Sequence, residues 1–406
     1  MSVQIFLQGK LVGIEKFAGS EVRPDAEGNV PGEAETVVGR CRWIGMLSEV
    51  LPRAVLAELG LARILLGWSG GGGFFLVLPQ ENLEAACELL DAADRDVRRR
   101  SGGLMRLAYG WTENLGDWLT VRKRLNEAVF RAVHTDSETR QEDYFRAHDN
   151  GDVIEDAVYF RELSESLREA KSVGWDSEAP GRVAVGGGKH QWPVGSGEDG
   201  IAVMRYAAPS GQGSGAASPE EMAAESEGLK SWGVLRGDVD GFAPRMRRVQ
   251  SVEDYVQLSV LYRQFLAGEL EIQCSLADYW RRVTVLYTGG DDFAVYGAWD
   301  ALLGLGREMQ RLFQRFSEVH LQELPGPEGK TITMALELAG EGEGLAAVYA
   351  RAGRSLEIAK NADRDCVRFF GATVEWRQMQ HTGQLKDILL RMVREFRMSA
   401  TRSWMN

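Results

Sequence analysis

Apolar residues along this chain alternate between short β-rich runs and longer segments with helical spacing. Residues 43–59 and 254–270 have the 3.6-residue spacing of amphipathic helices, and each ends in Glu-Leu. Each is followed by two apolar runs on either side of a glycine cluster, which predicts a β-hairpin because glycine supplies the positive φ of a tight turn. These paired runs are residues 64–68 with 74–78, and 283–287 with 293–296.

The two hairpins belong to a longer internal repeat. Residues 7–14 align with residues 235–242, so that a leucine and two glycines coincide at the same offset. Further strands are predicted at 331–338 and 367–370, with an amphipathic helix at 345–360 between them. Because the elements recur in the same order, the sequence indicates a duplicated α+β fold with sheets covered by helices.

The repeat divides the chain into four predicted parts. A first unit occupies residues 1–135 and a second unit residues 228–380. The segment between them, 136–227, has helical spacing at its start and is then rich in Gly and Ser, which is typical of a linker domain. Residues 381–406 are expected to form a C-terminal helix.

Composition limits the classes of function. The formal net charge of −12 argues against a chain whose main task is to bind a phosphate backbone directly, although contact through a partner stays open. No apolar run reaches the ~18 residues of a membrane span and the start lacks a secretory signal, so a cytoplasmic protein without membrane contact is expected. The four cysteines are too scattered for a zinc site or a disulfide framework.

The second unit carries the candidate chemistry. Asp238 and Asp240 end an apolar strand, and Asp291 and Asp292 lie in the predicted hairpin turn. If the two strands are neighbours, the carboxylates converge, and carboxylate oxygens are the ligands that Mg²⁺ prefers. We therefore expect these four residues to be catalytic and to bind metal. Two ordinary acidic turns are the alternative interpretation.

The first unit has the same frame without these carboxylates. Lys10 stands where Asp238 stands in the second unit, and glycines replace the hairpin aspartates. Lys10 is a candidate for binding a nucleotide phosphate, with a surface lysine as the alternative. Lys360 closes the helix at 345–360 and could reach a triphosphate, or it could serve the negative end of its own helix.

Taken together, these motifs resemble the large, polymerase-like subunit of type III CRISPR effector complexes. Residues 7–17, 39–42 and 69–74 resemble its first palm domain. The second palm domain is resembled by Gly237 to Gly241, Leu258-Ser259, Gly289-Gly290-Asp291-Asp292 and Ala359-Lys360. The resemblance covers roughly residues 1–130 and 230–375.

The resemblance implies two ferredoxin-like palm domains, related to nucleotide cyclases, that face each other across ATP sites. It implies a nucleotidyltransferase that uses Mg²⁺ or Mn²⁺ and joins ATP into cyclic oligoadenylates. Asp238 and Asp291 would be the leading metal ligands, supported by Asp240 and Asp292. The nucleotides would be bordered by Gly289, Gly290, Lys360, Ser69, Gly70, Gly71 and Lys10.

The resemblance also implies partners, namely the backbone and small subunits of the effector complex, and guide and target RNA through that complex. A His-Asp nuclease domain is not expected, since the palm begins at residue 4, so DNA cleavage is not expected either. Two other functions stay open: a stand-alone cyclic-nucleotide synthase and a non-catalytic structural subunit.

Overall fold

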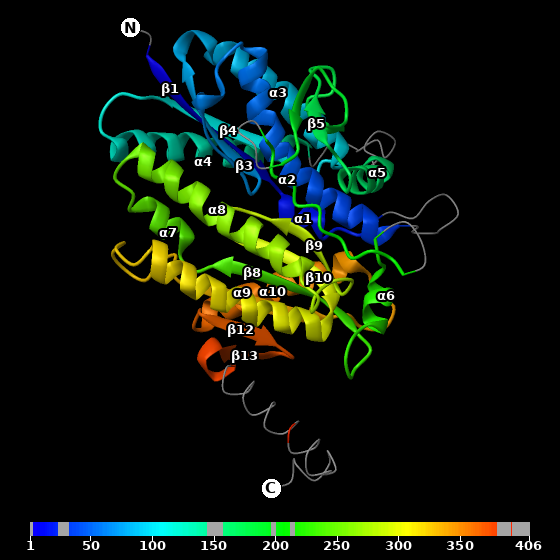
Figure 1. Ribbon diagram of the computed structural model, residues 1–406. Coiled ribbons are helices and arrows are strands. Elements are labelled where there is room, and N and C mark those ends of the chain that lie inside the picture. Colours follow the sequence, from blue (N-terminus) through cyan, green and yellow to red (C-terminus); the bar gives the residue numbers. More distant parts are fainter. Residues whose placement is uncertain are drawn as a thin grey trace.

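The computed structural model describes residues 3–22, 32–143, 157–195, 200–211, 216–379 and 391. Its first half is built on a four-stranded antiparallel sheet with the order β2-β3-β1-β4, in the upper part of Figure 1. The strands are β1 (Gln4–Val12), β2 (Leu66–Gly70), β3 (Gly73–Pro79) and β4 (Arg106–Glu113). The predicted hairpin of the first unit is β2 and β3.

The second half is built on a six-stranded sheet with the order β13-β12-β11-β8-β10-β9. The predicted hairpin of the second unit is β9 and β10, and β8 is the strand that delivers Asp238. The strands are β8 (Trp232–Val239), β9 (Val283–Thr288), β10 (Asp292–Ala298), β11 (Ile332–Leu338), β12 (Cys366–Phe369) and β13 (Ala372–Glu375).

The first four strands of each half have one topology, which is that of a ferredoxin-like fold. In chain order, both sheets run second, third, first, fourth, with β12 and β13 added to the second sheet. The registers agree as well, because Gly9 lies opposite Phe74 and Gly237 lies opposite Phe293. A Cβ atom on Gly9 would lie 2.2 Å from the Phe74 ring, and one on Gly237 would lie 2.4 Å from the Phe293 ring. The predicted α+β duplication is confirmed.

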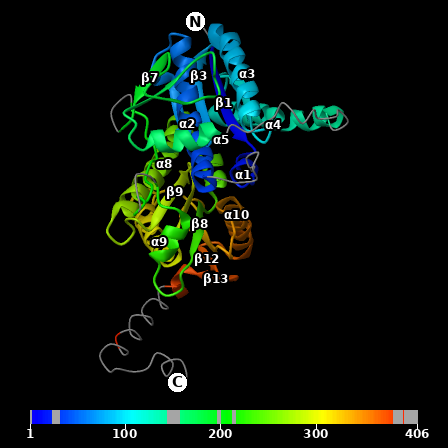
Figure 2. The same ribbon diagram turned by 90° about the vertical axis from the view of Figure 1, so that its right-hand side faces the viewer.

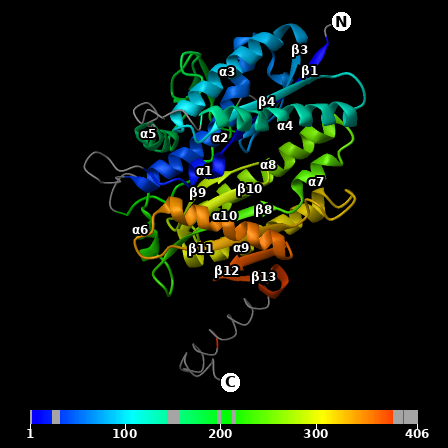
Figure 3. The ribbon, with the colours of Figure 1, turned by 180° about the vertical axis from the view of Figure 1, so that it is seen from behind.

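Helices cover both faces of each sheet. In the first half, α2 (Glu33–Glu58) and α3 (Leu83–Arg100) pack on one face, and α4 (Trp118–Asp143) packs on the other. In the second half, α8 (Val252–Ser275) and α9 (Trp299–His320) pack on one face, and α10 (Leu345–Ala362) packs on the other. Figure 3 shows α10 crossing the strands of the second sheet.

The two long helices α2 and α8 each bind both halves together. Val37 and Val38 at the start of α2 pack against Tyr296 in the second sheet. In the reciprocal way, Val252 and Val256 at the start of α8 pack against Phe75 in the first sheet. The helix α2 of the first half thus contacts the second sheet, and the helix α8 of the second half contacts the first sheet. These contacts hold the two hairpins face to face.

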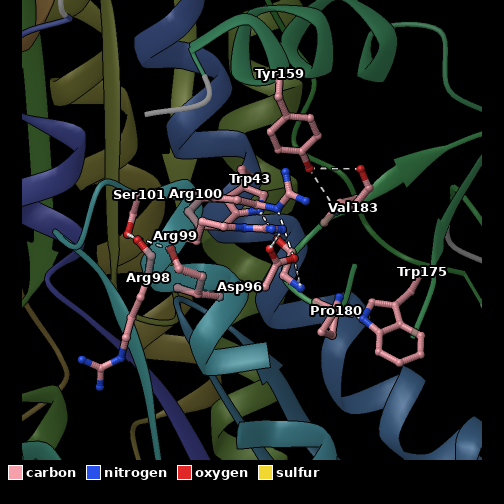
Figure 4. Close-up of polar contacts among 12 residues, drawn as sticks. Trp43, Asp96, Arg98, Arg99, Arg100, Ser101, Tyr159, Trp175, Pro180 and Val183 are labelled. Carbon is pink, nitrogen blue, oxygen red and sulfur yellow. Dashed lines mark hydrogen bonds and ion pairs between the residues drawn. The ribbon is translucent and has the colours of Figure 1, made fainter. Parts of the chain in front are cut away.

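The segment between the halves packs against both of them: residues from Tyr159 to Val203 join the core of the first half, whereas Ala208 and Met222 pack against the second sheet. It contains α5 (Ala157–Leu167), α6 (Pro219–Ala224) and a three-stranded antiparallel sheet with the order β6-β5-β7, in which glycines 186–188 form a turn. Asp96 accepts a hydrogen bond of 2.9 Å from the Gly181 amide, and the Trp43 indole donates one of 2.9 Å to the Gly181 carbonyl. Figure 4 shows Asp96 and Trp43 near Tyr159, Pro180 and Val183 of this segment. The strands are β5 (Ser172–Trp175), β6 (Ala184–Val185) and β7 (His190–Pro193).

Short elements complete the described chain: α1 (Ile14–Ala18), α7 (Phe242–Arg247), and the 3₁₀ turns η1 (Arg63–Leu65) and η2 (Gln80–Asn82). The C-terminal helix predicted for residues 381–406 lies outside the described residues, apart from residue 391. Among the helices that the structure describes, none combines the length and the apolar character needed to span a membrane.

Candidate active site

Asp238 and Asp292 lie opposite each other on the adjacent antiparallel strands β8 and β10. Asp238 is the next-to-last residue of β8 and Asp292 is the first residue of β10, so both are at the same edge of the sheet. The preceding residue, Asp291, is tied to this edge because its carbonyl accepts a 2.8 Å hydrogen bond from the Val239 amide. The predicted convergence of the strand and the hairpin is therefore what the structure shows.

Asp240 is placed differently from the other three aspartates. It is buried, and its carboxylate accepts hydrogen bonds from the hydroxyls of Thr331 and Thr333, at 2.8 and 2.7 Å, and from the Asp365 amide at 3.0 Å. These contacts saturate much of its lone-pair capacity. Asp240 thus holds the end of β8 against β11 and the start of β12, and its role in catalysis and metal binding stays a prediction.

The carboxylates at this edge are held in an environment that disfavours their charge. Burial raises the pKa of Asp238 to about 6, and repulsion from Asp292 and Asp240 adds to the effect, while Lys360 opposes it. Burial also raises the pKa of Asp291, with further repulsion from Asp292 and Asp238. Such mutual repulsion is relieved by a cation.

Lys360 supplies one cation to this group. Its Nζ atom lies 2.9 Å from an Asp238 carboxylate oxygen and 3.4 Å from Glu357 on its own helix. The sequence left open whether Lys360 reaches a triphosphate or serves the end of its own helix, and the structure places it against Asp238. Because it is only partly exposed, it is positioned to neutralise Asp238 and to meet an anionic group bound there.

The side chains at this edge can be compared with the ligands that Mg²⁺ prefers. Across the described residues, no three His, Cys, Asp or Glu side chains form a ready-made metal cluster. Mg²⁺ does not require one, since it is usually held by one or two carboxylates together with water and substrate phosphates. The facing pair Asp238 and Asp292, with Asp291 beside them, fits that mode of binding. Asp240, already hydrogen-bonded, fits a role in positioning Asp238.

The raised pKa of Asp238 makes a prediction about stability. A carboxyl whose pKa is higher in the folded state binds protons more tightly there, so the metal-free protein should lose stability as the pH rises from about 4 to about 6. The shift corresponds to about 3 kcal/mol at most. Urea unfolding in EDTA should show this loss, and Asp238→Asn should flatten it. The exposed Asp278→Asn is the control, and an equal flattening in both variants would contradict the assignment.

The glycine turns of the two hairpins touch each other. A Cβ atom on Gly71 would lie 2.6 Å from the backbone nitrogen of Gly290. Gly71 also has a φ of +59°, a conformation that other residues adopt only at a cost. The contact therefore depends on glycine, and it places the turn of the first half directly against the Gly-Gly-Asp-Asp turn of the second.

A cleft of about 780 Å³ opens where the two turns meet. It is within the size range of about 300–1,000 Å³ that small-molecule sites have. Its walls come from both halves, and they contain five of the residues predicted to border a nucleotide, together with one predicted catalytic aspartate. These are Lys10, Ser69, Gly70, Gly71, Gly290 and Asp291.

Two of the predicted nucleotide-binding residues have other contacts. Ser69 is buried, and its hydroxyl donates a 2.7 Å hydrogen bond to Glu49 in α2. Glu49 in turn forms an ion pair of 2.5 Å with Arg263 in α8, so Ser69 belongs to a network that holds the first glycine turn across both halves. Gly289 packs against the Asp292 carboxylate and borders a smaller cavity of about 40 Å³.

A second polar network was not anticipated from the sequence. Arg236, buried on the central strand β8, donates two hydrogen bonds, of 2.5 and 2.6 Å, to Glu15 in α1 of the first half. It donates a third, of 3.0 Å, to the Tyr287 hydroxyl, which donates one of 2.9 Å to Asp292. The guanidinium also lies 4.5 Å from the centre of the Tyr349 ring. The orientation of Asp292 is thereby linked to the position of the first half.

Glu15→Ala should weaken the packing of the halves. The substitution removes the one carboxylate whose two oxygens accept hydrogen bonds from the buried Arg236 guanidinium. Hydrogen bonds to charged groups contribute about 1.5–3 kcal/mol to stability. Since the Glu15 side chain is 59% exposed, we expect a loss of about 1–2 kcal/mol of unfolding free energy. Urea unfolding at pH 7 measures it, with the exposed neighbour Lys16→Ala as control. An unchanged midpoint for Glu15→Ala would show that the ion pair contributes nothing.

Comparison of the sequence with known proteins finds similarity to one family. Residues 231–368 match the family model for the second palm domain of Cas10/Cmr2. The CRISPR system single-strand-specific deoxyribonuclease Cas10/Csm1 (subtype III-A) of Thermococcus onnurineus is 28% identical over 117 residues, which are 25% of this chain and 15% of that protein. The corresponding Enterococcus italicus protein is 30% identical over 95 residues, or 22% and 12% of the two chains.

Solved structures extend the similarity to nearly the whole chain. The Csm1-Csm4 cassette in complex with AMPPNP matches with a TM-score of 0.71 and 19% identity over 92% of this chain and 57% of that chain. Csm1 of T. onnurineus matches with a TM-score of 0.69 and 17% identity over 92% and 55%. The chain thus spans little more than half of these Csm1 chains. The resemblance noted in the sequence is confirmed: residues 231–368 match the second palm domain of Cas10/Cmr2, and the described chain as a whole has a fold similar to that of Csm1.

Proposed function

We propose that this chain is the palm subunit of a type III CRISPR effector complex and joins ATP into cyclic oligoadenylates, with Mg²⁺ or Mn²⁺ as cofactor. The observation that carries the proposal is the facing pair Asp238 and Asp292 at the edge where the glycine turns of both halves meet. In this proposal the cleft, which has walls from both halves and Asp291 in its lining, would hold two nucleotides beside these carboxylates, as bond formation between nucleotides requires.

The residues of the cleft and those of the aspartate group beside it have distinct tasks in this proposal. The glycine turns let phosphate oxygens approach backbone N–H groups closely, and Lys10 adds a positive charge from the first half. Lys360 neutralises Asp238 and faces any phosphate bound beside it. Asp238, Asp291 and Asp292 would hold the metal, whose chemistry is to neutralise phosphate charge and to favour ionisation of the attacking hydroxyl. Tyr287 orients Asp292 through a hydrogen bond, and Asp240 holds the end of the strand that carries Asp238.

Substrate and partners are inferred from similar proteins. Solved Csm1-Csm4 cassettes with this fold are described in complex with one ATP, with cA3 and with cA4. Another is described as part of the type III-A CRISPR-Csm interference complex. We infer that this chain likewise takes ATP, and that it assembles with backbone and small subunits and, through them, with guide and target RNA.

Two other functions compete with this proposal. A stand-alone cyclic-nucleotide synthase would be active without RNA or other subunits. A non-catalytic subunit would bind its partners but form no product. The arrangement of the aspartates favours catalysis over a structural role, because a set of carboxylates that raise each other's pKa is costly to keep without a cation or substrate.

Mass spectrometry of the products tests the proposal. The chain is incubated with ATP and Mg²⁺, alone and with co-purified partners plus target RNA, next to an Asp291→Ala, Asp292→Ala variant. We expect cyclic oligoadenylates from the wild type in the complete complex and none from the variant. Product without partners or RNA would favour the stand-alone synthase. No nucleotide product from the complete, RNA-triggered complex would favour the structural subunit.

A further inference from the structure

A groove along α4 continues the nucleotide cleft beyond the aspartates. It has a volume of about 670 Å³, and it shares Arg122, Asn126, Phe130 and Arg247 with the cleft. Its remaining lining residues all belong to α4, which runs out from the body of the protein in Figure 2. The cleft therefore has an extension that could hold a second unit of ligand, of the same size class as the first.

The floor of the groove is fixed. The Arg122 guanidinium donates hydrogen bonds to the carbonyls of Met246 at 2.9 Å and Val249 at 3.0 Å. These bonds tie α4 to α7 and the segment after it. The groove thus joins an element of the first half to one of the second.

The charge of the groove is opposite to that of the chain. Its lining contains four basic side chains and one carboxylate, whereas the chain as a whole has a net charge of −12. Lys123 is 78% exposed and Arg131 is also exposed, so both are accessible to a ligand. A local excess of positive charge on an acidic protein attracts phosphate groups and excludes acidic partners.

Apolar and aromatic surface lies among these cations. Phe130 is 62% exposed and Leu119 is 42% exposed. The Phe130 ring stacks on His134, with 3.9 Å between ring centroids, so that its orientation is set. Basic side chains interleaved with a fixed aromatic ring are the combination that binds single-stranded nucleic acid, since bases stack on the ring while cations contact the backbone.

We propose that the α4 groove binds a linear oligonucleotide of a few residues whose reacting end lies in the nucleotide cleft. The proposal rests on the nucleotide-joining function proposed above and adds a place for the intermediate. Continuity with the cleft selects this occupant, because a strand that leaves the aspartates along the shared wall meets Phe130 first and then Lys123 and Arg131. The groove would keep a short intermediate bound between successive additions.

Fluorescence anisotropy of the full chain tests the groove. The probe is a linear 5′-triphosphorylated triadenylate with a fluorophore on the base of its middle residue, so that both ends stay free to enter the cleft. It is used in EDTA so that no reaction occurs, and ATP is measured in parallel. The double substitution Lys123→Ala, Arg131→Ala removes two cations and should lower the affinity of the chain for the probe about tenfold at low salt. The slope of log affinity against log salt should fall by about 0.7 for each phosphate that the variant no longer neutralises. Phe130→Ala should weaken the probe at least about fivefold.

A substitution that is expected to raise the affinity for the probe controls for misfolding of the variants. Glu127→Gln removes the one carboxylate of the groove and should strengthen probe binding about twofold, which a misfolded variant cannot do. Controls are Arg311→Ala and Val319→Ala on α9, whose side chains are exposed outside the groove. These should leave the probe affinity unchanged.

The outcomes separate the groove from the function on which it rests. If ATP binds and the probe binds no better, or if the groove variants leave the probe unaffected, the groove proposal is wrong and the nucleotide cleft stands. If neither ATP nor the probe binds to the wild type, the proposed function fails and the groove proposal fails with it. Selective loss of probe affinity in the Lys123→Ala, Arg131→Ala variant, with ATP affinity within about twofold of wild type, supports it.

Discussion

Asp238→Asn should lower the formation of nucleotide product by about a hundredfold or more in a complex that is active with the wild-type chain. Asn keeps the size of the side chain but removes the charge that faces Asp292 and pairs with Lys360. Removal of one group that stabilises charge in a transition state costs about 10²–10³ in rate. Product formation is followed by chromatography, and binding of ATP in EDTA is measured beside it.

Asp240→Asn is the matched comparison for Asp238→Asn. Asp240 is buried and accepts its hydrogen bonds from Thr331, Thr333 and the Asp365 amide, so it acts on the site through its neighbour. Loss of an orienting partner typically costs about 10- to 100-fold. We therefore expect a smaller loss of rate and a larger loss of stability than for Asp238→Asn. If Asp238→Asn retained wild-type rates, the candidate site would be wrong.

Gly71→Ala should also abolish most of the activity, although Gly71 carries no functional group. Its added Cβ atom would lie 2.6 Å from the Gly290 backbone, which cannot move aside as a flexible side chain can. The two turns would have to separate, and a displacement of about 1 Å in a site that positions its substrates can cost about a hundredfold in rate. The rate of product formation and the affinity for ATP should both fall.

Gly60→Ala provides the control for Gly71→Ala. Gly60 has a similar φ of +65°, but a Cβ atom there would meet nothing within 4 Å. This variant bears only the cost of placing alanine in the left-handed region, about 1 kcal/mol of stability. Equal losses of activity in the two variants would mean that backbone strain, and not the contact between the turns, explains the effect.

Much of the frame could be predicted because it is local in sequence. The hairpins were found from glycines between apolar runs, and they are β2 with β3 and β9 with β10. The duplication could be predicted because a leucine and two glycines fall at the same offset in both copies, and the first of these glycines, Gly9 or Gly237, packs against Phe74 or Phe293. Asp238 and Asp292 could be paired since a strand and a hairpin in one small sheet leave few arrangements.

What could not be predicted depends on contacts between distant residues. Arg236 and Glu15 are 221 positions apart, and an arginine in a strand does not indicate which carboxylate it will meet. For the same reason, the sequence does not predict the hydrogen bond from Ser69 to Glu49. The helix predicted from residue 43 begins at Glu33, because its first turns pack on the second half and so have a buried face that the sequence of the first half does not explain.

The amino-acid composition of the segment between the halves does not predict how that segment packs. Its Gly and Ser content predicted a linker domain, and Gly186 and Gly188, between β6 and β7, have positive φ. Composition did not show that Trp175 and Phe160 join the core of the first half, or that Tyr159 exchanges hydrogen bonds with the Val183 backbone. A few buried aromatic residues are enough to fix a segment whose average composition is polar.

The first half retains a role without aspartates of its own. It contributes Lys10 and the first glycine turn to the cleft, Glu15 to the network that orients Asp292, and most of the α4 groove. Loss of carboxylates from one copy, with retention of its turn, is what a site shared between two copies requires. The second half alone would lack one wall of the cleft.

Photo-crosslinking of ATP tests most directly the claim that one nucleotide cleft is built from both halves. The full chain is irradiated with an azido-ATP in EDTA, digested, and the labelled peptides are identified by mass spectrometry, with excess ATP as competitor. The account predicts competed labels in peptides from both sides of the cleft, around residues 68–73 and 242–263. Labels confined to one half, or to surfaces outside the cleft, would contradict it.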